Sequence, residues 1–307
     1  MSADHSQRRA GFLYGLGAYL AWGVLPLYFK LLAAVPPVEI VANRIIWSLL
    51  FLVALVSFRR RWPEIRRAMS PKVIGILFVT ATLIAANWLI YVWAVVTGHV
   101  LEASLGYYLN PLFNVLLGVL LLRERLSRAQ AAAVLLAAAG VAALAWGAGA
   151  GLWISVSLAF SFGLYGFIRK IAPVDALEGL SIETAMLAPL SLLYLLWVHD
   201  GGLGLGALDR VTAGLLILGG AVTAIPLLLF NAAARRLPYS TLGFLQYLAP
   251  SLQFLLAVLV FGERFTAAHA LCFGAIWTAL AIFIVEGLRL ARARARNAAE
   301  EVLEPCP

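Results

Sequence analysis

Apolar residues dominate this chain in runs of about twenty, and short polar stretches separate the runs. An α-helix of roughly 20 apolar residues is long enough to cross the hydrocarbon core of a bilayer. The pattern predicts an all-α integral membrane protein with ten transmembrane helices. These helices are expected at about residues 12–32, 38–58, 73–96, 101–122, 128–146, 152–170, 179–199, 212–233, 239–261 and 267–288.

Composition and charge agree with this interpretation. The chain is 63% apolar and 12% charged, whereas a soluble globular domain carries about 25% charged residues. If the N-terminus is cytoplasmic, nineteen of the 23 lysines and arginines fall in segments on that side and three on the other. Positive loops stay in the cytoplasm, so both termini are predicted to be cytoplasmic. Residues 289–307 form a basic cytoplasmic tail.

One stretch of the chain returns 139 residues later, because residues 101–127 align with residues 240–266. A five-helix unit is therefore predicted twice, at 11–147 and at 151–288. Since five is an odd number, the second unit enters the membrane upside down relative to the first. Inverted repeats of this kind are typical of secondary carriers.

Polar and aromatic side chains recur on one face of several spans, at spacings of three, four and seven residues. Inside a membrane such a face needs a polar neighbour or water. It therefore predicts the lining of a substrate cavity: Trp22, Asn87, Tyr91, Tyr107, Tyr108, Asn114, Ser161, Tyr165, Asn231, Gln246 and Gln253. Pro111 and Pro250 occupy equivalent positions within two of these faces, so they are predicted to act as hinges.

Arg44 and Glu183 are charged residues within predicted spans, and the shift of 139 residues places them opposite each other. A charge inside the membrane costs at least about 2.5 kcal/mol on insertion scales. The sequence leaves two explanations open. Either residue contacts the substrate, or each lies near a helix end and there snorkels or pairs with Lys30 or Glu178.

Three features resemble the EamA family of the drug/metabolite transporter superfamily, in particular its RarD branch. They are the paired P-x(12)-ER-x-[ST] elements, AYLAWGVLPLYFK at 18–30, and NRIIWS at 43–48. The resemblance covers about residues 11–288. It implies a ten-helix, multi-pass exporter in the bacterial inner membrane, with a central cavity.

The expected function is a secondary transporter that exports or exchanges small organic solutes, such as amino acids, metabolites or amphipathic drugs. One alternative is a membrane enzyme of lipid or isoprenoid metabolism, but no aspartate lies inside a span and the four histidines are not grouped. Another is a passive channel, which would need a filter or rings of like charge. We expect a protein that is not an enzyme.

The expected partners are a small-molecule substrate and membrane lipid, with no nucleic acid, because the positive residues mark topology and form no soluble basic surface. No phosphate-binding loop of the form GxxxxGK[ST] occurs, so work must be driven by a gradient. The only cysteines, Cys272 and Cys306, are too few and too far apart for a metal site. We therefore expect no cofactor, and either a monomer or a homodimer.

Overall fold

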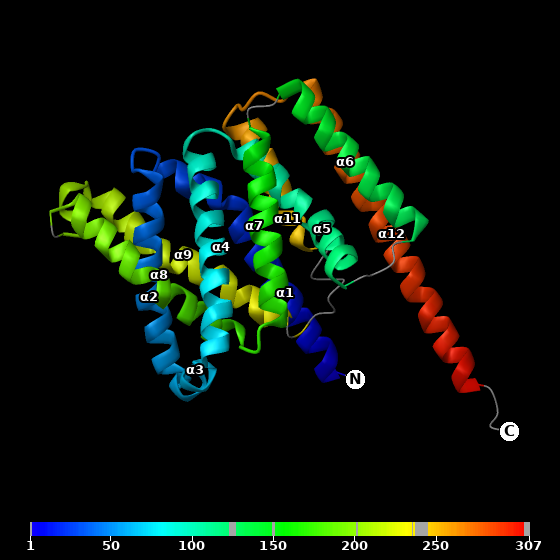
Figure 1. Ribbon diagram of the computed structural model, residues 1–307, viewed down its shortest axis with the longest axis horizontal. Helices are drawn as coiled ribbons and strands as arrows, with labels where there is room; N and C mark the ends of the chain where they lie inside the picture. The colour runs from blue at the N-terminus through cyan, green and yellow to red at the C-terminus, as the bar shows by residue number, and fades with distance from the viewer. Residues whose placement is uncertain are drawn as a thin grey trace. The chain divides into compact units, whose positions relative to one another are not determined.

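The structure is a computed structural model, and the residues that it describes form helices and contain no strand (Figure 1). Its description covers the backbone of residues 2–122, 127–148, 151–200, 202–234, 236 and 245–303. The predicted all-α class is confirmed. Helices suit a membrane because their backbone hydrogen bonds are satisfied within the element, without water.

The long helices appear in the predicted order. They are α1 (Ser2–Leu31), α2 (Pro37–Phe58), α4 (Pro71–Val96), α5 (Val100–Leu122), α6 (Arg128–Ala148), α7 (Leu152–Ile171), α8 (Ala176–Val198), α9 (Arg210–Ala234) and α12 (Ala267–Leu303). The shorter elements are α3 (Trp62–Ala68), η1 (Leu205–Ala207), α11 (Leu248–Leu255) and the π-helical segment η2 (Leu256–Val260).

Six of the described helices are long and apolar enough to cross a membrane, namely α1, α2, α4, α7, α8 and α9. Shorter apolar segments occupy 128–144, 248–260 and 267–282. Each of the ten predicted spans contains helix in its described part. An integral membrane protein is therefore supported by length and composition, while the full set of ten spans and the side of the membrane on which the termini lie stay predictions.

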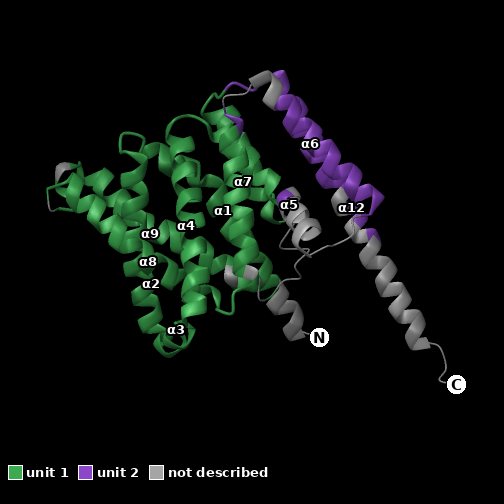
Figure 2. Ribbon diagram, viewed as in Figure 1, with its two compact units in different colours: residues 1–110, 153–263 green, residues 111–152, 264–307 purple. Residues whose placement is uncertain are grey.

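The chain divides into two compact units, residues 1–110 with 153–263 and residues 111–152 with 264–307 (Figure 2). This division follows packing, whereas the predicted boundaries at 11–147, 151–288 and 289–307 follow the internal repeat. The repeat boundaries stay predictions.

In the smaller unit, α6 and α12 pack closely along each other. A Cβ atom added at Gly140 would lie 2.7 Å from the Cβ atom of Ala275, so only glycine permits this approach. Ser127 and Gln130 form a reciprocal capping box at the start of α6, with N···O distances of 2.9 and 3.2 Å.

In the larger unit, α2 packs against both α8 and α9 (Figure 1). The ends of α2 and α8 show that these two helices are antiparallel. Glu39, near the start of α2, lies 3.0 Å from His199, which follows α8. Arg61, just after α2, donates to Glu178 in the first turn of α8 at 2.8 Å. The predicted repeat makes α2 and α8 equivalent, so their antiparallel course is the relation that an inverted repeat requires.

Candidate functional site

Three of the predicted cavity residues meet around Asn87, which is 1% exposed. The amide nitrogen of Asn87 donates to the Ser161 hydroxyl at 3.0 Å and to the Leu158 carbonyl at 3.2 Å. The amide oxygen of Asn87 accepts a hydrogen bond from Tyr107 at 3.3 Å. These contacts join α4, α5 and α7 through polar groups in the interior of the larger unit.

Aromatic rings extend this polar centre in two directions. The ring of Tyr91 lies 5.5 Å from that of Tyr107 and 5.9 Å from that of Phe29. On the other side, Phe162 lies 5.9 Å from Tyr107 and 6.2 Å from Tyr165. Predicted residues from α4, α5 and α7 therefore belong to one continuous interior cluster.

A second group of predicted residues lies around Trp22 on α1. The Trp22 ring lies 5.5 Å from Tyr19 and 5.7 Å from Phe230. The Gln253 amide donates to the Trp22 carbonyl at 3.1 Å. Gln253 was predicted to line the substrate cavity, but it is 2% exposed, so water does not reach it in this conformation.

Part of the polar face of α5 meets α11. Ser104 donates to the Pro250 carbonyl at 2.7 Å, and the hydroxyls of Tyr108 and Ser251 lie 2.6 Å apart. The rings of Tyr108 and Tyr247 stack at 6.4 Å. Gln246 is half-buried. The side chains of Asn114, Asn231 and Pro111 lie outside the described residues.

Arg44 is the eighth residue of α2 and is 4% exposed. Its Nε donates to the Thr223 hydroxyl on α9 at 3.0 Å. The guanidinium carbon lies 5.0 Å from the Phe29 ring and 5.2 Å from the Trp88 ring. The sequence left open that Arg44 pairs with Glu178 or snorkels to a helix end. The structure shows neither, because Arg44 is bonded to Thr223 in the interior.

Glu183 is the eighth residue of α8 and is 1% exposed. Its carboxylate accepts a hydrogen bond from Thr80 on α4 at 2.5 Å and from Tyr165 on α7 at 3.4 Å. Arg169 Nε lies 3.6 Å from the same carboxylate. Glu183 is therefore paired with a cation, and this cation is Arg169 rather than Lys30.

The sites of Arg44 and Glu183 are built alike. Each charge is the eighth residue of its helix. Arg44 is bonded to a threonine of α9 and has Tyr28 of α1 beside it. Glu183 is bonded to a threonine of α4 and to Tyr165 of α7. Because α2 and α8 are antiparallel, the two charges lie toward opposite ends of this helix pair. The two sites differ in charge compensation, because among the described residues Glu183 has an oppositely charged partner and Arg44 has none.

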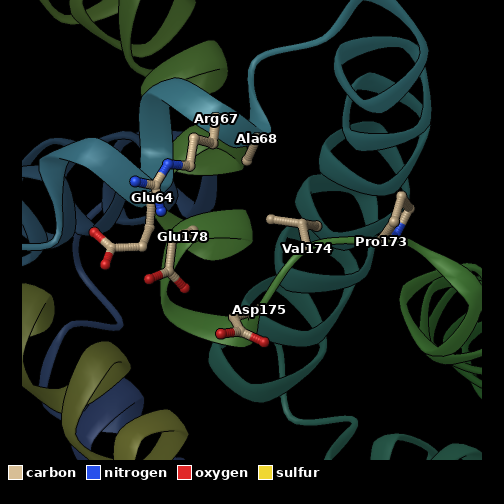
Figure 3. A pocket seen from close by; sticks show the side chains of 7 residues that line it. All are labelled: Glu64, Arg67, Ala68, Pro173, Val174, Asp175 and Glu178. Atoms are coloured by element: carbon tan, nitrogen blue, oxygen red, sulfur yellow. The ribbon is translucent and has the colours of Figure 1, made fainter.

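Charged residues also join the elements at both ends of the larger unit. At one end a cleft of about 300 Å³ lies between α3 and the start of α8, and the carboxyl groups of Glu64, Asp175 and Glu178 lie at it (Figure 3). Arg61 bridges Asp175 and Glu178 there. At the other end the Glu263 carboxylate accepts the backbone N–H groups of Val100 and Leu101, which begin α5.

Several polar atoms in this interior have no hydrogen-bond partner among the described residues. They are Nη1 of Arg44, the hydroxyl of Tyr91, both amide atoms of Asn110 and Oε1 of Gln253. A buried polar atom without a partner costs free energy, so such atoms are normally satisfied by protein, water or ligand. The described residues contain no group of three or more His, Cys, Asp or Glu that could hold a metal ion. These atoms are able to bind water or a polar solute.

Sequence reasoning missed the partners of both buried charges, which are Thr80, Thr223, Arg169, Phe29 and Trp88. A signal for the threonines existed, because the shift of 139 residues brings Thr80 to position 219, one helical turn before Thr223. The contacts themselves join residues more than a hundred positions apart. They depend on the packing of helices, which the pattern along one chain does not specify.

Comparison with known proteins identifies the family. Residues 9–146 match the EamA-like transporter family. The chain is 50% identical over 288 residues to an uncharacterised transporter of Pseudomonas aeruginosa, covering 92% of this chain and 96% of the relative. It is 44% identical over 287 residues to the protein RarD of Escherichia coli, covering 93% and 97%.

A second Pseudomonas aeruginosa relative, named chloramphenicol-sensitive protein RarD, is 35% identical over 292 residues, covering 94% of this chain and 97% of that one. A solved crystal structure aligns with a TM-score of 0.56 at 23% identity, covering 90% of this chain and 97% of the other, and it supports the fold alone. The predicted resemblance is confirmed, and the chain belongs to the RarD branch of the EamA-like transporter family.

Proposed function

We propose that this protein is a secondary transporter that exports or exchanges small organic solutes across the bacterial inner membrane by alternating access. The observation that carries the proposal is the pair of similarly built charge sites on the antiparallel helices α2 and α8. A carrier with inverted repeats holds its substrate between two equivalent halves that face opposite compartments. An inverted repeat is expected to produce two sites of the same construction that lie toward opposite ends of the helix pair.

The contacts at the two ends of the larger unit supply the gates that the mechanism needs. The bridge from Arg61 to Asp175 and Glu178 holds α2 and α8 together at one end. The bonds from Val100 and Leu101 to Glu263 hold the start of α5 at the other. In the proposed cycle one set of contacts opens while the other stays closed, so the buried polar atoms are exposed to one compartment at a time.

An enzyme or a channel fits these observations less well. The fully buried carboxylates among the described residues each have a basic partner. Glu39 contacts His199, Glu178 contacts Arg61, and Glu183 contacts Arg169. A hydrolytic or transfer reaction would need a free acid or base beside a reactive centre. A passive channel would need a continuous open path, whereas Asn87, Arg44 and Gln253 are buried. The proposed protein works as a monomer or homodimer among membrane lipids, without a cofactor.

Counterflow in proteoliposomes tests the proposal. Purified protein is reconstituted with one unlabelled solute inside, and uptake of the same labelled solute is followed from a trace concentration outside. The panel contains amino acids, simple carboxylates and chloramphenicol, the last because one relative carries that drug in its name. A carrier produces transient uptake above equilibrium, since its empty form returns more slowly than its loaded form. A channel produces simple equilibration.

The matched control is a variant in which the gate formed by Arg61, Asp175 and Glu178 cannot open. Cysteines at positions 61 and 178 are joined by a reducible thiol cross-linker, after Cys272 and Cys306 have been replaced by serine. Counterflow should stop after cross-linking and return after reduction. Counterflow that persists through the cross-link would contradict the proposed gate, and uptake without any overshoot would contradict the carrier.

A further inference from the structure

Arg44 is the one fully described intramembrane cation that lacks an anion in the interior of the larger unit. No ion pair joins it to a carboxylate among the described residues, and Nε makes the only hydrogen bond of its guanidinium there. Arginine stays protonated under all ordinary conditions. A single positive charge is therefore enclosed by apolar and aromatic groups, which is unfavourable unless a counter-charge enters.

The position of this guanidinium is fixed by its surroundings. Thr223 accepts from Nε and in turn donates to the Gly219 carbonyl at 2.8 Å. A Cβ atom added at Gly219 would lie 3.1 Å from Cγ of Arg44 and 2.9 Å from the Tyr28 hydroxyl, so glycine at this position lets the stem of Arg44 lie against α9. The guanidinium is thus held in one orientation, and its Nη1 has no acceptor among the described residues.

Aromatic side chains pack around the guanidinium. Phe29 and Trp88 lie 5.0 and 5.2 Å from its carbon. Tyr28, Tyr91 and Tyr107 are close enough to interact with the charge electrostatically. The Tyr91 hydroxyl has no hydrogen-bond partner among the residues that the structure describes, and it is a donor that can bind an anion together with Arg44. Rings of this kind also provide an apolar surface for the rest of a ligand.

The chemistry of these groups selects a class of ligand. The planar fork of arginine matches a carboxylate with two parallel N–H···O bonds. One cation neutralises one anionic charge, whereas a phosphate dianion would leave a second charge uncompensated in the same apolar surroundings. We infer that Arg44 binds the carboxylate of a transported monocarboxylate whose adjacent apolar or aromatic group packs against Phe29 and Trp88. This inference rests on the proposed function and names its substrate class.

The equivalent site on α8 supports this reading by contrast. Glu183 has Arg169 at 3.6 Å and two hydroxyl donors, so its charge is compensated within the protein. Arg44 has the corresponding hydroxyl partner but no corresponding anion in the described part of the chain. If Arg44 were only structural, its site would be expected to be completed in the same way. The missing partner is therefore assigned to the ligand.

Binding to the purified protein in detergent tests the inference without transport. Tryptophan fluorescence is titrated with phenylacetate, 3-methylbutanoate and phenylalanine, with the amides of the first two, and with inorganic phosphate. A carboxylate of the panel should bind and its amide should not. Arg44→Gln should raise its Kd about tenfold to a hundredfold, as expected for the loss of a charged hydrogen-bonded pair. Arg44→Lys should have an intermediate effect, because it keeps the charge and loses the fork.

Two further variants separate positioning from bulk charge. Thr223→Val should weaken binding less than Arg44→Gln, and Thr223→Ser should restore it, because serine keeps the acceptor. Arg59→Gln removes the same charge from an exposed position at the end of α2 and should leave Kd unchanged. Arg44→Gln should also have a melting temperature at least equal to that of the wild type, because it removes a buried charge without a counter-ion.

The outcomes distinguish this inference from the proposed function. Equal binding of acid and amide, preference for phosphate, an unchanged Kd in folded Arg44→Gln, or no binding of any carboxylate would each contradict the inference. If counterflow of neutral solutes occurs in such a case, the result supports the carrier function and contradicts the proposed role of Arg44. If carboxylates bind through Arg44 but no solute shows counterflow, the result supports the binding site and contradicts the carrier function.

Discussion

At the residue scale, a buried charge is tolerated only with its partners, and Arg169 is the partner of Glu183. Arg169→Gln leaves the carboxylate buried without a cation, and breaking a buried pair in this way costs about 3–5 kcal/mol of unfolding free energy. We expect a clear fall in melting temperature in detergent. Arg66→Gln, which removes an exposed arginine from α3, should have no such effect.

A second substitution provides the decisive comparison for this pair. Glu183→Gln added to Arg169→Gln removes the unpaired charge, while Thr80 can still bond to the new side chain. The double variant should regain most of the lost stability. A double variant as unstable as Arg169→Gln would show that Arg169 stabilises the fold by packing and not by compensating the charge of Glu183.

The sequence located the two buried charges but not their environments. Arg44 and Glu183 were found because charges are rare within apolar runs and because the repeat aligned them. Their partners Thr223, Thr80 and Arg169 were not found. A threonine or an arginine in or near a span can have several structural roles. The packing of α2 on α9 and of α4 on α8 shows which residues contact the two charges.

At the scale of elements, Glu263 caps a helix from the other half of the sequence. It follows η2, outside the apolar segment, and binds the first N–H groups of α5. Burial raises the pKa of Glu263, and Glu102 nearby raises it further, while the two N–H groups and Lys30 act in the opposite direction. The contribution of such an acid to stability is fully present below its unfolded pKa and declines as the pH rises through the folded pKa.

This sign gives a prediction about pH. The melting temperature of the wild type minus that of Glu263→Gln should be largest near pH 4 and should decline toward pH 7. Asp209 supplies a control of opposite sign, because hydrogen bonds from Thr212 and Val211 lower its pKa. The wild type relative to Asp209→Asn should lose stability as the pH falls. A Glu263 difference that grows with pH would mean that the N–H groups outweigh burial.

Pro250 was predicted to be a hinge, and the structure places a helix irregularity on each side of it. The helix is interrupted at Tyr247, and the π-helical segment η2 follows α11. Pro250→Ala supplies an N–H group that can bond to the Gln246 carbonyl. We expect a melting temperature at least equal to that of the wild type and counterflow several-fold slower. A wild-type rate would show that Pro250 shapes the helix without gating transport.

The sequence indicated polar faces on the spans that contain α5 and α11, and Ser104 and Tyr108 of α5 contact α11. It did not indicate that Tyr107 turns away toward Asn87, or that Gln253 is buried against Trp22. Helical periodicity gives the face on which a residue lies, but the neighbour that covers the face depends on long-range packing. The side chains of Pro111 and Asn114, on the same helix, lie outside the described residues.

At the scale of the whole molecule, the account depends on two gates that are never open together. The antiparallel course of α2 and α8 follows from the contacts at both of their ends. Hydropathy and the repeat predicted this relation, because five spans invert the second half. The contacts that open and close in the proposed cycle were beyond sequence reasoning, since one sequence pattern is compatible with every state of such a cycle.

Spin-label distances in proteoliposomes test this claim most directly. One pair of labels, at positions 66 and 171, spans the end closed by Arg61, and a second pair, at positions 97 and 260, spans the end closed by Glu263. All four positions are exposed. As a transported solute is added, the account predicts that one distance distribution lengthens while the other shortens. Two distances that stay fixed, or that lengthen together, would contradict alternating access.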